Sequence, residues 1–260
     1  PHLACVMGWQ PALSVLGGAL VAGAVAWALL GRVPQMERAG GAGVTFREVG
    51  EALRSRVTWL LGLADGVAFA QYLALVTWLP TYYHEVRGMS LPQAGAVVGV
   101  VPLVGIGTVL LAGYLCARTG LRRPFFIVPG ALAGVAGFGA FLFESLALTY
   151  AAMVLLGFVS FFYLPAQLTV PMELEGMDTQ RVAVVWSAMF AIASVLGVVA
   201  PITVGVMTDT LGTYAPAFAL WAVVAWGLLA AGLVLPETGP GARRPAAARA
   251  AVEGGAADDP

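Results

Sequence analysis

The strongest constraint on this chain is the stretch Val57–Tyr83, which is long and apolar enough to cross a bilayer yet carries an aspartate, Asp65. It is the only acid that the sequence places well inside an apolar run. A charged group at membrane depth costs about 2.5 to 3.5 kcal/mol on insertion scales. An acid kept at that cost is by default a functional-site hypothesis.

The composition identifies a membrane protein, because 60% of the residues are hydrophobic and only 10% are charged, against about a quarter charged in soluble domains. We expect an all-α integral membrane fold with seven transmembrane helices, each of about 20 mostly apolar residues. The predicted spans are Pro11–Leu30, Val57–Tyr83, Pro92–Cys116, Pro124–Phe143, Leu146–Val170, Val182–Thr208 and Thr213–Leu235.

Arginine predicts the orientation. All 13 basic residues are Arg, and twelve of them fall in the connection Gly31–Arg56 or in the segments after the third, fifth and seventh spans. The alternate loops contain only Arg87. Because positive charge marks the cytoplasmic side, we expect a multi-pass protein of the plasma membrane with its N-terminus outside and its C-terminus in the cytoplasm.

Four segments follow from this pattern. Residues 1–30 hold one span, and residues 31–56 form a cytoplasmic linker. Within that linker, the helical spacing of apolar residues over Phe46–Arg56 predicts an amphipathic helix on the inner membrane surface. Residues 57–236 form a six-helix unit, and residues 237–260 form a disordered tail rich in Ala, Gly and Pro.

Polar residues are unevenly distributed among the spans. The first, fourth and seventh spans are almost purely apolar, whereas the second and fifth carry the polar groups. These are Asp65, Gln71, Tyr72 and Thr77, and Ser160, Tyr163, Gln167 and Thr169. A helix with one polar face needs a cavity or a partner, and a pattern that repeats every three helices is typical of transporters built from 3+3 inverted repeats.

Three motifs resemble the major facilitator superfamily. The start GWQPALSVLGGAL (Gly8–Leu20) resembles the opening of that family's sixth helix, GYLCARTGLRR (Gly113–Arg123) resembles its loop motif after helix eight, and PETG (Pro236–Gly239) is similar to the acidic motif after helix twelve. The resemblance implies helices six to twelve of that fold: a six-helix C-terminal half, plus one helix of an N-terminal half that is absent.

The loop motif implies a gate. Its matching residues are Gly113, Arg118, Gly120, Arg122 and Arg123. In the family an acid of this motif helps to lock one conformation, and this chain has Ala117 at that position. The arginines therefore have two open interpretations, as a latch of the closed state or as orientation anchors near anionic lipid.

Finer placement rests on two further runs. MELEGMDTQRVAVVW (Met172–Trp186) and GVVAPITVGVMTDTLG (Gly197–Gly212) look like the branch that includes cyanate and nitroimidazole transporters. A nitrate-type carrier would be expected to hold an Arg in helix eight, and Pro92–Cys116 contains none. This disfavours nitrate, although an Arg of the missing half could meet an anion.

The candidate site residues each have a structural alternative. We expect Asp65 to bind and release a proton during transport. The alternative is an acid near the interface that is hydrogen-bonded to a neighbouring helix or reached by the linker arginines. The predicted substrate contacts are Gln71, Tyr72, Ser160, Tyr163 and Gln167. Their alternative is interhelical hydrogen bonding, worth about 0.6 kcal/mol a pair. The small residues of the sixth span, Ser187, Ala191, Ser194, Pro201 and Gly205, predict helix packing.

The sequence thus favours a proton-coupled secondary transporter that moves a small solute by alternating access. Multidrug efflux within the same superfamily is the first alternative, because Phe69, Phe161, Phe162 and Tyr163 suit an apolar cation. A seven-helix receptor or sensor is the second, but the absence of Lys excludes a retinal protein. No HExxH or GxSxG motif indicates an enzyme.

We expect no cofactor, no metal site and no nucleic acid. The expected partners are a small-molecule solute, with a small organic anion as one candidate, together with protons, the lipid bilayer and the missing N-terminal half.

Overall fold

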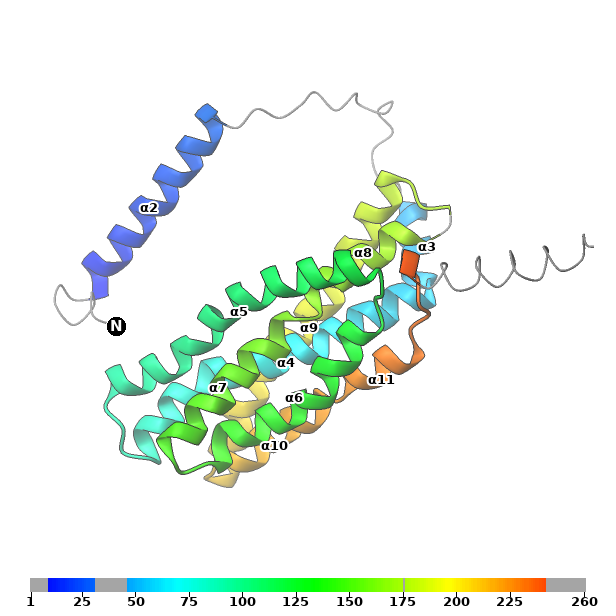
Figure 1. Cartoon of the computed structure of the whole chain (residues 1–260). Coiled ribbons are helices and arrows are strands. Elements are labelled where there is room, and N and C mark those ends of the chain that lie inside the picture. The colour runs from blue at the N-terminus through cyan, green and yellow to red at the C-terminus, as the bar shows by residue number, and fades with distance from the viewer. Residues whose placement is uncertain (1–8, 31–45, 175, 242–260) are drawn as a thin grey trace, which may run out of the picture.

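The computed structural model describes residues 9–30, 46–174 and 176–241, and every regular element within them is an α-helix. Six spans are long and apolar enough to cross a membrane, and they lie side by side in one bundle (Figure 1). They are α4 (Arg56–Glu85), α5 (Leu91–Thr119), α6 (Pro124–Leu142), α7 (Leu146–Phe161) with α8 (Leu164–Glu173), α9 (Thr179–Leu211), and α10 (Ala215–Val224) with α11 (Gly227–Val234). The predicted all-helical membrane fold is confirmed.

The first predicted span, Pro11–Leu30, differs from the other six. It is part of helix α2 (Trp9–Leu30), whose described apolar stretch Gly17–Leu30 is shorter than the other six spans. All of its side chains whose exposure is described are exposed, and Figure 1 shows α2 apart from the bundle. The predictions for residues 31–45 and for the tail beyond residue 241 lie outside the described residues.

The span ends follow from local sequence. Ser90 and Gln93 form a reciprocal capping box at the start of α5. The side chain of Asp178 caps α9 by accepting the backbone N–H three residues later. Gly120 and Gly212 end α5 and α9 in the left-handed conformation, with φ of 64° and 69°, which glycine adopts without a steric penalty.

The fifth span is broken in the middle. Pro165 lacks a backbone N–H, and its ring crowds the carbonyl of Phe161 four residues earlier, so the helix cannot continue undisturbed. The break separates α7 from α8 at Phe162 and Tyr163. Phe162 and Tyr163 form the turn at this break, and Tyr163 contributes to the site described below.

Helix α3 (Phe46–Arg54) occupies the stretch predicted as an amphipathic helix and ends before Ser55, which caps α4. Ala52 is buried in the bundle, and the Gln180 side chain of α9 donates to the Glu48 carboxylate at 3.1 Å. Helix α3 therefore packs on the end of α9. Its location on the inner membrane surface stays a prediction.

Two buried clusters fill the bundle, one toward each end. Along α4, the cluster nearer α3 includes Ala68, and the cluster at the far end begins at Ala70. Along the fifth span the same change falls between Val159 and Phe162. Ser160 therefore lies where the two clusters meet, whereas Asp65 and Tyr163 lie on the side of the cluster nearer α3.

Close approach of α6 to α11 depends on Gly130, where an added Cβ would overlap the backbone of Leu229. We expect Gly130→Ala to lower the free energy of unfolding by about 1 to 3 kcal/mol, as overpacking does. The matched control is Gly107→Ala in α5, where an added Cβ meets nothing within 4 Å. Thermal melting of both variants in detergent checks this, and equal melting shifts would contradict it.

Candidate functional site

A cavity of about 270 Å³ opens between α4, the break of the fifth span and α9. Its walls combine one carboxylate, four hydroxyl groups and several aromatic rings. The lining residues are Asp65, Phe69, Tyr72, Ser160, Phe161, Tyr163, Leu164, Phe190, Ala193 and Ser194. The cavity thus joins the two spans that the sequence marks as polar, and α9 closes it.

Asp65 is held in the cavity wall by the broken span. Its side chain is 5% exposed, and the hydroxyl of the buried Tyr163 donates to Asp65 Oδ1 at 2.8 Å. The Gln167 amide approaches the same carboxylate. The Gln167 amide does not reach hydrogen-bonding geometry with this carboxylate, and both its Nε2 and its Oε1 are buried without a partner. Asp65 is therefore buried with hydroxyl and amide neighbours but no cationic one.

Glycine brings α4 and α9 close enough to enclose this site. Gly62, about one turn before Asp65, faces Ile192 of α9. Gly66, the residue after Asp65, faces Ala193 and Leu196 of the same helix. A Cβ at Gly66 would overlap the end of the Leu196 side chain, and one at Gly62 would press on the Ile192 side chain. The aspartate therefore lies where α4 and α9 are in close contact, and it is 5% exposed.

Aromatic rings line much of the rest of the cavity. The Tyr72 ring meets the Phe161 ring edge to face, with centroids 5.5 Å apart, and lies nearly parallel to the Phe69 ring at 6.4 Å. Phe190 adds a further ring from α9. None of the lining residues is basic.

The structure separates the predicted substrate contacts into two groups. Tyr72, Ser160 and Tyr163 line the cavity with Asp65, and the Ser160 hydroxyl is buried without a partner. Gln167 lies beside them without lining the cavity. Gln71 has a packing role instead: its Nε2 donates to the carbonyl of Ala133 in α6 at 2.8 Å, and it does not line the cavity.

Sequence reasoning missed the wall that α9 contributes. Phe190, Ala193 and Ser194 line the cavity, whereas the sequence assigned the small residues of this span to packing alone. Ser194 has a local hydrogen bond, because its hydroxyl donates to the Phe190 carbonyl at 2.7 Å within its own helix. A serine satisfied in this way needs no polar cavity, so its presence in the span did not indicate one.

The predicted gating loop holds a second polar cluster, at the end of the bundle near α3. The Arg122 guanidinium pairs with Glu173 of α8 at 2.6 Å and donates to the Cys116 carbonyl at 2.8 Å. Burial alone would lower the pKa of Arg122, but the hydrogen bonds and charge of Glu173 and Cys116 outweigh it and raise the pKa. Arg122 therefore stays cationic at every relevant pH.

Glu237 completes this cluster from the chain's C-terminal segment. Its carboxylate accepts the backbone N–H of Arg122 at 2.6 Å and of Arg123 at 3.1 Å. Arg123 in turn donates to the carbonyl of Leu233 at the end of α11. We call Arg122, Arg123, Glu173 and Glu237 the loop cluster, and it ties four helix ends of this bundle together.

The other residues of the predicted gate differ in their surroundings. Gly120 lies next to the loop cluster, where its carbonyl accepts the N–H of Gly241. Gly113 has open space around it. Arg118 is exposed and lies over the Tyr114 ring, 5.3 Å from its centroid.

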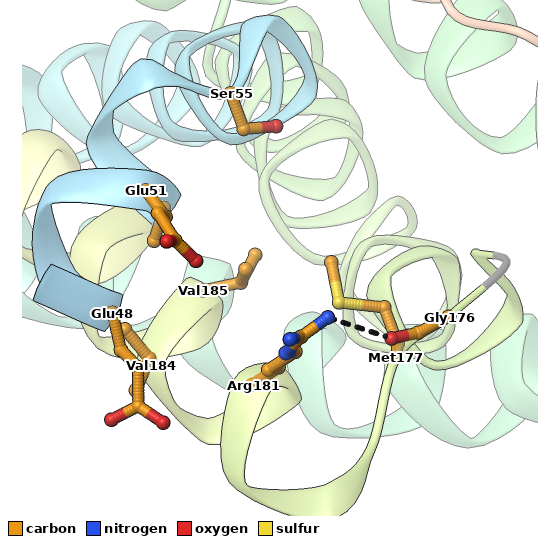
Figure 2. A pocket seen from close by; sticks show the side chains of 9 residues that line it. Glu48, Glu51, Ser55, Gly176, Met177, Arg181, Val184 and Val185 are labelled. Atoms are coloured by element: carbon orange, nitrogen blue, oxygen red, sulfur yellow. Dashed lines mark hydrogen bonds between the residues drawn. The ribbon is translucent and has the colours of Figure 1, made fainter.

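A shallower hollow of about 210 Å³ lies between α3 and the start of α9 (Figure 2). Glu51 and Arg181 both point toward it, but Arg181 donates to the Gly176 carbonyl and Glu51 pairs with Arg47. These charged groups are exposed and already partnered. Among the described residues, no group of three or more His, Cys, Asp or Glu side chains is placed to hold a metal ion.

Comparison with known proteins gives two curated relatives. The probable nitrate/nitrite antiporter NarK1 of Thermus thermophilus is 32% identical over 126 residues, which are 44% of this chain and 28% of that protein. The MFS-type transporter TOXA of Cochliobolus carbonum is 36% identical over 81 residues, which are 30% of this chain and 14% of that protein. The matched parts are thus under a third of each relative.

A solved structure shares the fold. It is the crystal structure of a bacterial homologue of the human lysosomal transporter Spinster, in an inward-facing and unoccupied conformation. The two agree with a TM-score of 0.52 at 20% identity, over 87% of this chain and 56% of that one. The family model described as Major Facilitator Superfamily matches residues 1–197. The chain therefore belongs to the major facilitator superfamily.

Proposed function

We propose that this chain supplies the C-terminal half of a secondary active transporter, which moves a small solute by alternating access and couples that movement to protons. The cavity around Asp65 is this half's part of the solute site. One observation carries the proposal: a buried carboxylate in the wall of a cavity between three spans, without a basic neighbour among the lining residues.

Coupling follows from the cost of that carboxylate. An unpaired charge in a low-dielectric site is unfavourable, so the acid is stable there as a neutral group or opposite an arriving cation. Gain and loss of a proton at Asp65 would make its charge depend on the side to which the cavity opens. A solute whose binding responds to that charge is then driven by the proton gradient.

We propose the following roles for the segments of the chain. Residues 1–30 belong with the other half, residues 31–56 form the linker, residues 57–236 form the six-helix unit and residues 237–260 the cytoplasmic tail. Orientation rests on arginine, since Arg54, Arg118, Arg122 and Arg181 share one end of the bundle and Arg87 lies at the other. By the positive-inside rule, the end near α3 faces the cytoplasm of a plasma-membrane protein.

Two chemical classes of solute are candidates. The name of the Thermus thermophilus relative favours an anion such as nitrate, and an anion needs a cationic contact from outside the described cavity, because no basic residue lines it. Drug efflux is favoured by the rings of Phe69, Tyr72 and Phe161. The placement near cyanate and nitroimidazole transporters stays a prediction. A receptor role has no observation in its favour.

Chemical labelling tests whether the cavity is a solute pathway. Ser194 lines the cavity and is exposed, so Ser194→Cys in a background without other cysteines should react with a membrane-impermeant thiol reagent. A transported solute should slow that reaction, because it would occupy the space next to the thiol.

Ser187→Cys is the matched control. Ser187 lies on the same helix, is exposed and donates to the carbonyl four residues earlier, as Ser194 does, but it does not line the cavity. Its labelling rate should not respond to the solute. Equal protection at both positions, or none at Ser194 with a solute that the protein transports, would contradict the proposed pathway.

A further inference from the structure

We infer that the cavity of this half holds a cationic group of the solute, such as an organic ammonium on an apolar body, with Asp65 as its counter-charge. The inference rests on the proposed function, because it names the class of solute that the proposed site takes. It would set this chain apart from carriers of nitrate-like anions.

The charge that the cavity lining can carry is negative. Asp65 is its only ionisable residue besides two tyrosines, and the arginines of the described spans lie at helix ends, as Arg56, Arg118 and Arg181 do. Helices α6, α10 and α11 contain no titratable residue, so nothing from them can neutralise the carboxylate. An anion in this cavity would meet a like or neutral wall, whereas a cation would meet the missing counter-charge.

The hydrogen bonds leave room for such a ligand. Tyr163 donates to Asp65 Oδ1, and a carboxylate can accept several more hydrogen bonds. The unpartnered Ser160 hydroxyl adds a polar contact in the same wall. A cationic group placed beside Asp65 would therefore face oxygen atoms and no basic side chain of the cavity lining.

The rings supply the second half of the recognition. Phe69, Tyr72, Phe161 and Phe190 all line the cavity together with the carboxylate. The faces of aromatic rings attract cations, and more strongly when the site is shielded from water. A carboxylate together with several rings matches an alkylated ammonium better than it matches a small hydrated anion.

The test is equilibrium binding to the purified full-length protein by calorimetry, with phenyltrimethylammonium as the cationic probe. Benzenesulfonate, of similar size and opposite charge, and nitrate are the comparison probes. We expect phenyltrimethylammonium to bind more tightly than either anion. Tighter binding of benzenesulfonate or nitrate, or no binding of phenyltrimethylammonium, would overturn the inference.

Variants locate the contact. Asp65→Asn should weaken phenyltrimethylammonium binding by about 30-fold or more, because it removes one member of a shielded charge pair. Asp65→Glu keeps the charge and should retain binding, and Asp209→Asn is the matched control at an exposed position on α9. Phe161→Leu should weaken binding about tenfold through the lost ring. Unchanged binding by Asp65→Asn would overturn the inference.

The binding measurements and a transport measurement test the two proposals independently. A protein that transports nitrate and does not bind phenyltrimethylammonium overturns this inference and leaves the transporter proposal intact. A protein that binds phenyltrimethylammonium through Asp65 but transports no solute overturns the transporter proposal and leaves this inference intact.

Discussion

Replacing Arg122 with methionine is expected to destabilise the protein by about 3 kcal/mol, the lower end of the cost of breaking a buried ion pair. The Arg122 side chain is 7% exposed and that of Glu173 is 21% exposed, so solvent screens this pair only weakly. The substitution leaves the Glu173 carboxylate without its guanidinium partner and also removes the donor to the Cys116 carbonyl. Thermal melting in detergent measures the loss.

Arg118→Met is the matched control. Arg118 is four residues earlier and contacts only the Tyr114 ring among the interactions described, so its loss should change stability by no more than about 0.5 kcal/mol. Replacing both Arg122 and Glu173 with methionine should recover part of the stability, because no unpaired charge remains. Equal effects of the two single arginine substitutions would contradict the assigned role of the loop cluster.

The loop cluster also bears on the predicted gate. Arg122 and Arg123 bind groups of their own bundle, namely Glu173, Glu237 and the carbonyl of Leu233. In this structure they hold the helix ends of one half together. A role of these arginines as a latch toward the other half stays a prediction, and Arg118 is the exposed member of the motif that such a latch would need.

The polar pattern of the sequence identified much of the cavity. Asp65, Tyr72, Ser160 and Tyr163 were predicted because polar side chains are rare in apolar spans, and the structure places all four in one wall. Burial in a membrane leaves few uses for such groups, so their positions carry much information. The helical spans were readable for the same reason, since length and hydropathy determine them.

Other features depend on arrangement in space, which one sequence does not encode locally. Gln71 is adjacent to Tyr72, but the next position on a helix points about 100° away, and there it meets the Ala133 carbonyl of α6. The wall from α9 has no polar signal at Phe190 or Ala193. The partner of Arg122 in α8 is 51 residues away and could be found only from the packed bundle.

Replacing Asp65 with asparagine is expected to abolish the proton movement that accompanies solute transport. The amide has nearly the same shape as the carboxylate and can still accept the hydrogen bond from Tyr163, so the fold should be retained. Unlike a carboxylate, the asparagine amide does not take up and release a proton near neutral pH. Exchange of labelled solute for unlabelled solute needs no net proton transfer, so it should persist at solute concentrations high enough to offset the weaker binding that we expect of this variant.

Asp209→Asn provides the control, because it makes the same chemical change at an exposed position near the end of α9. It should leave both proton movement and solute exchange unchanged. A loss of activity shared by the two variants would indicate a general effect of removing an acid rather than a role of Asp65.

The most direct test of proton coupling is therefore solute-driven proton flux in liposomes that contain the full-length protein and a pH-sensitive dye. With wild-type protein and with Asp209→Asn, adding a transported solute on one side should change the internal pH. With Asp65→Asn, the internal pH should follow that of protein-free liposomes. An Asp65→Asn protein that moves the same number of protons per solute as the wild type would contradict the account.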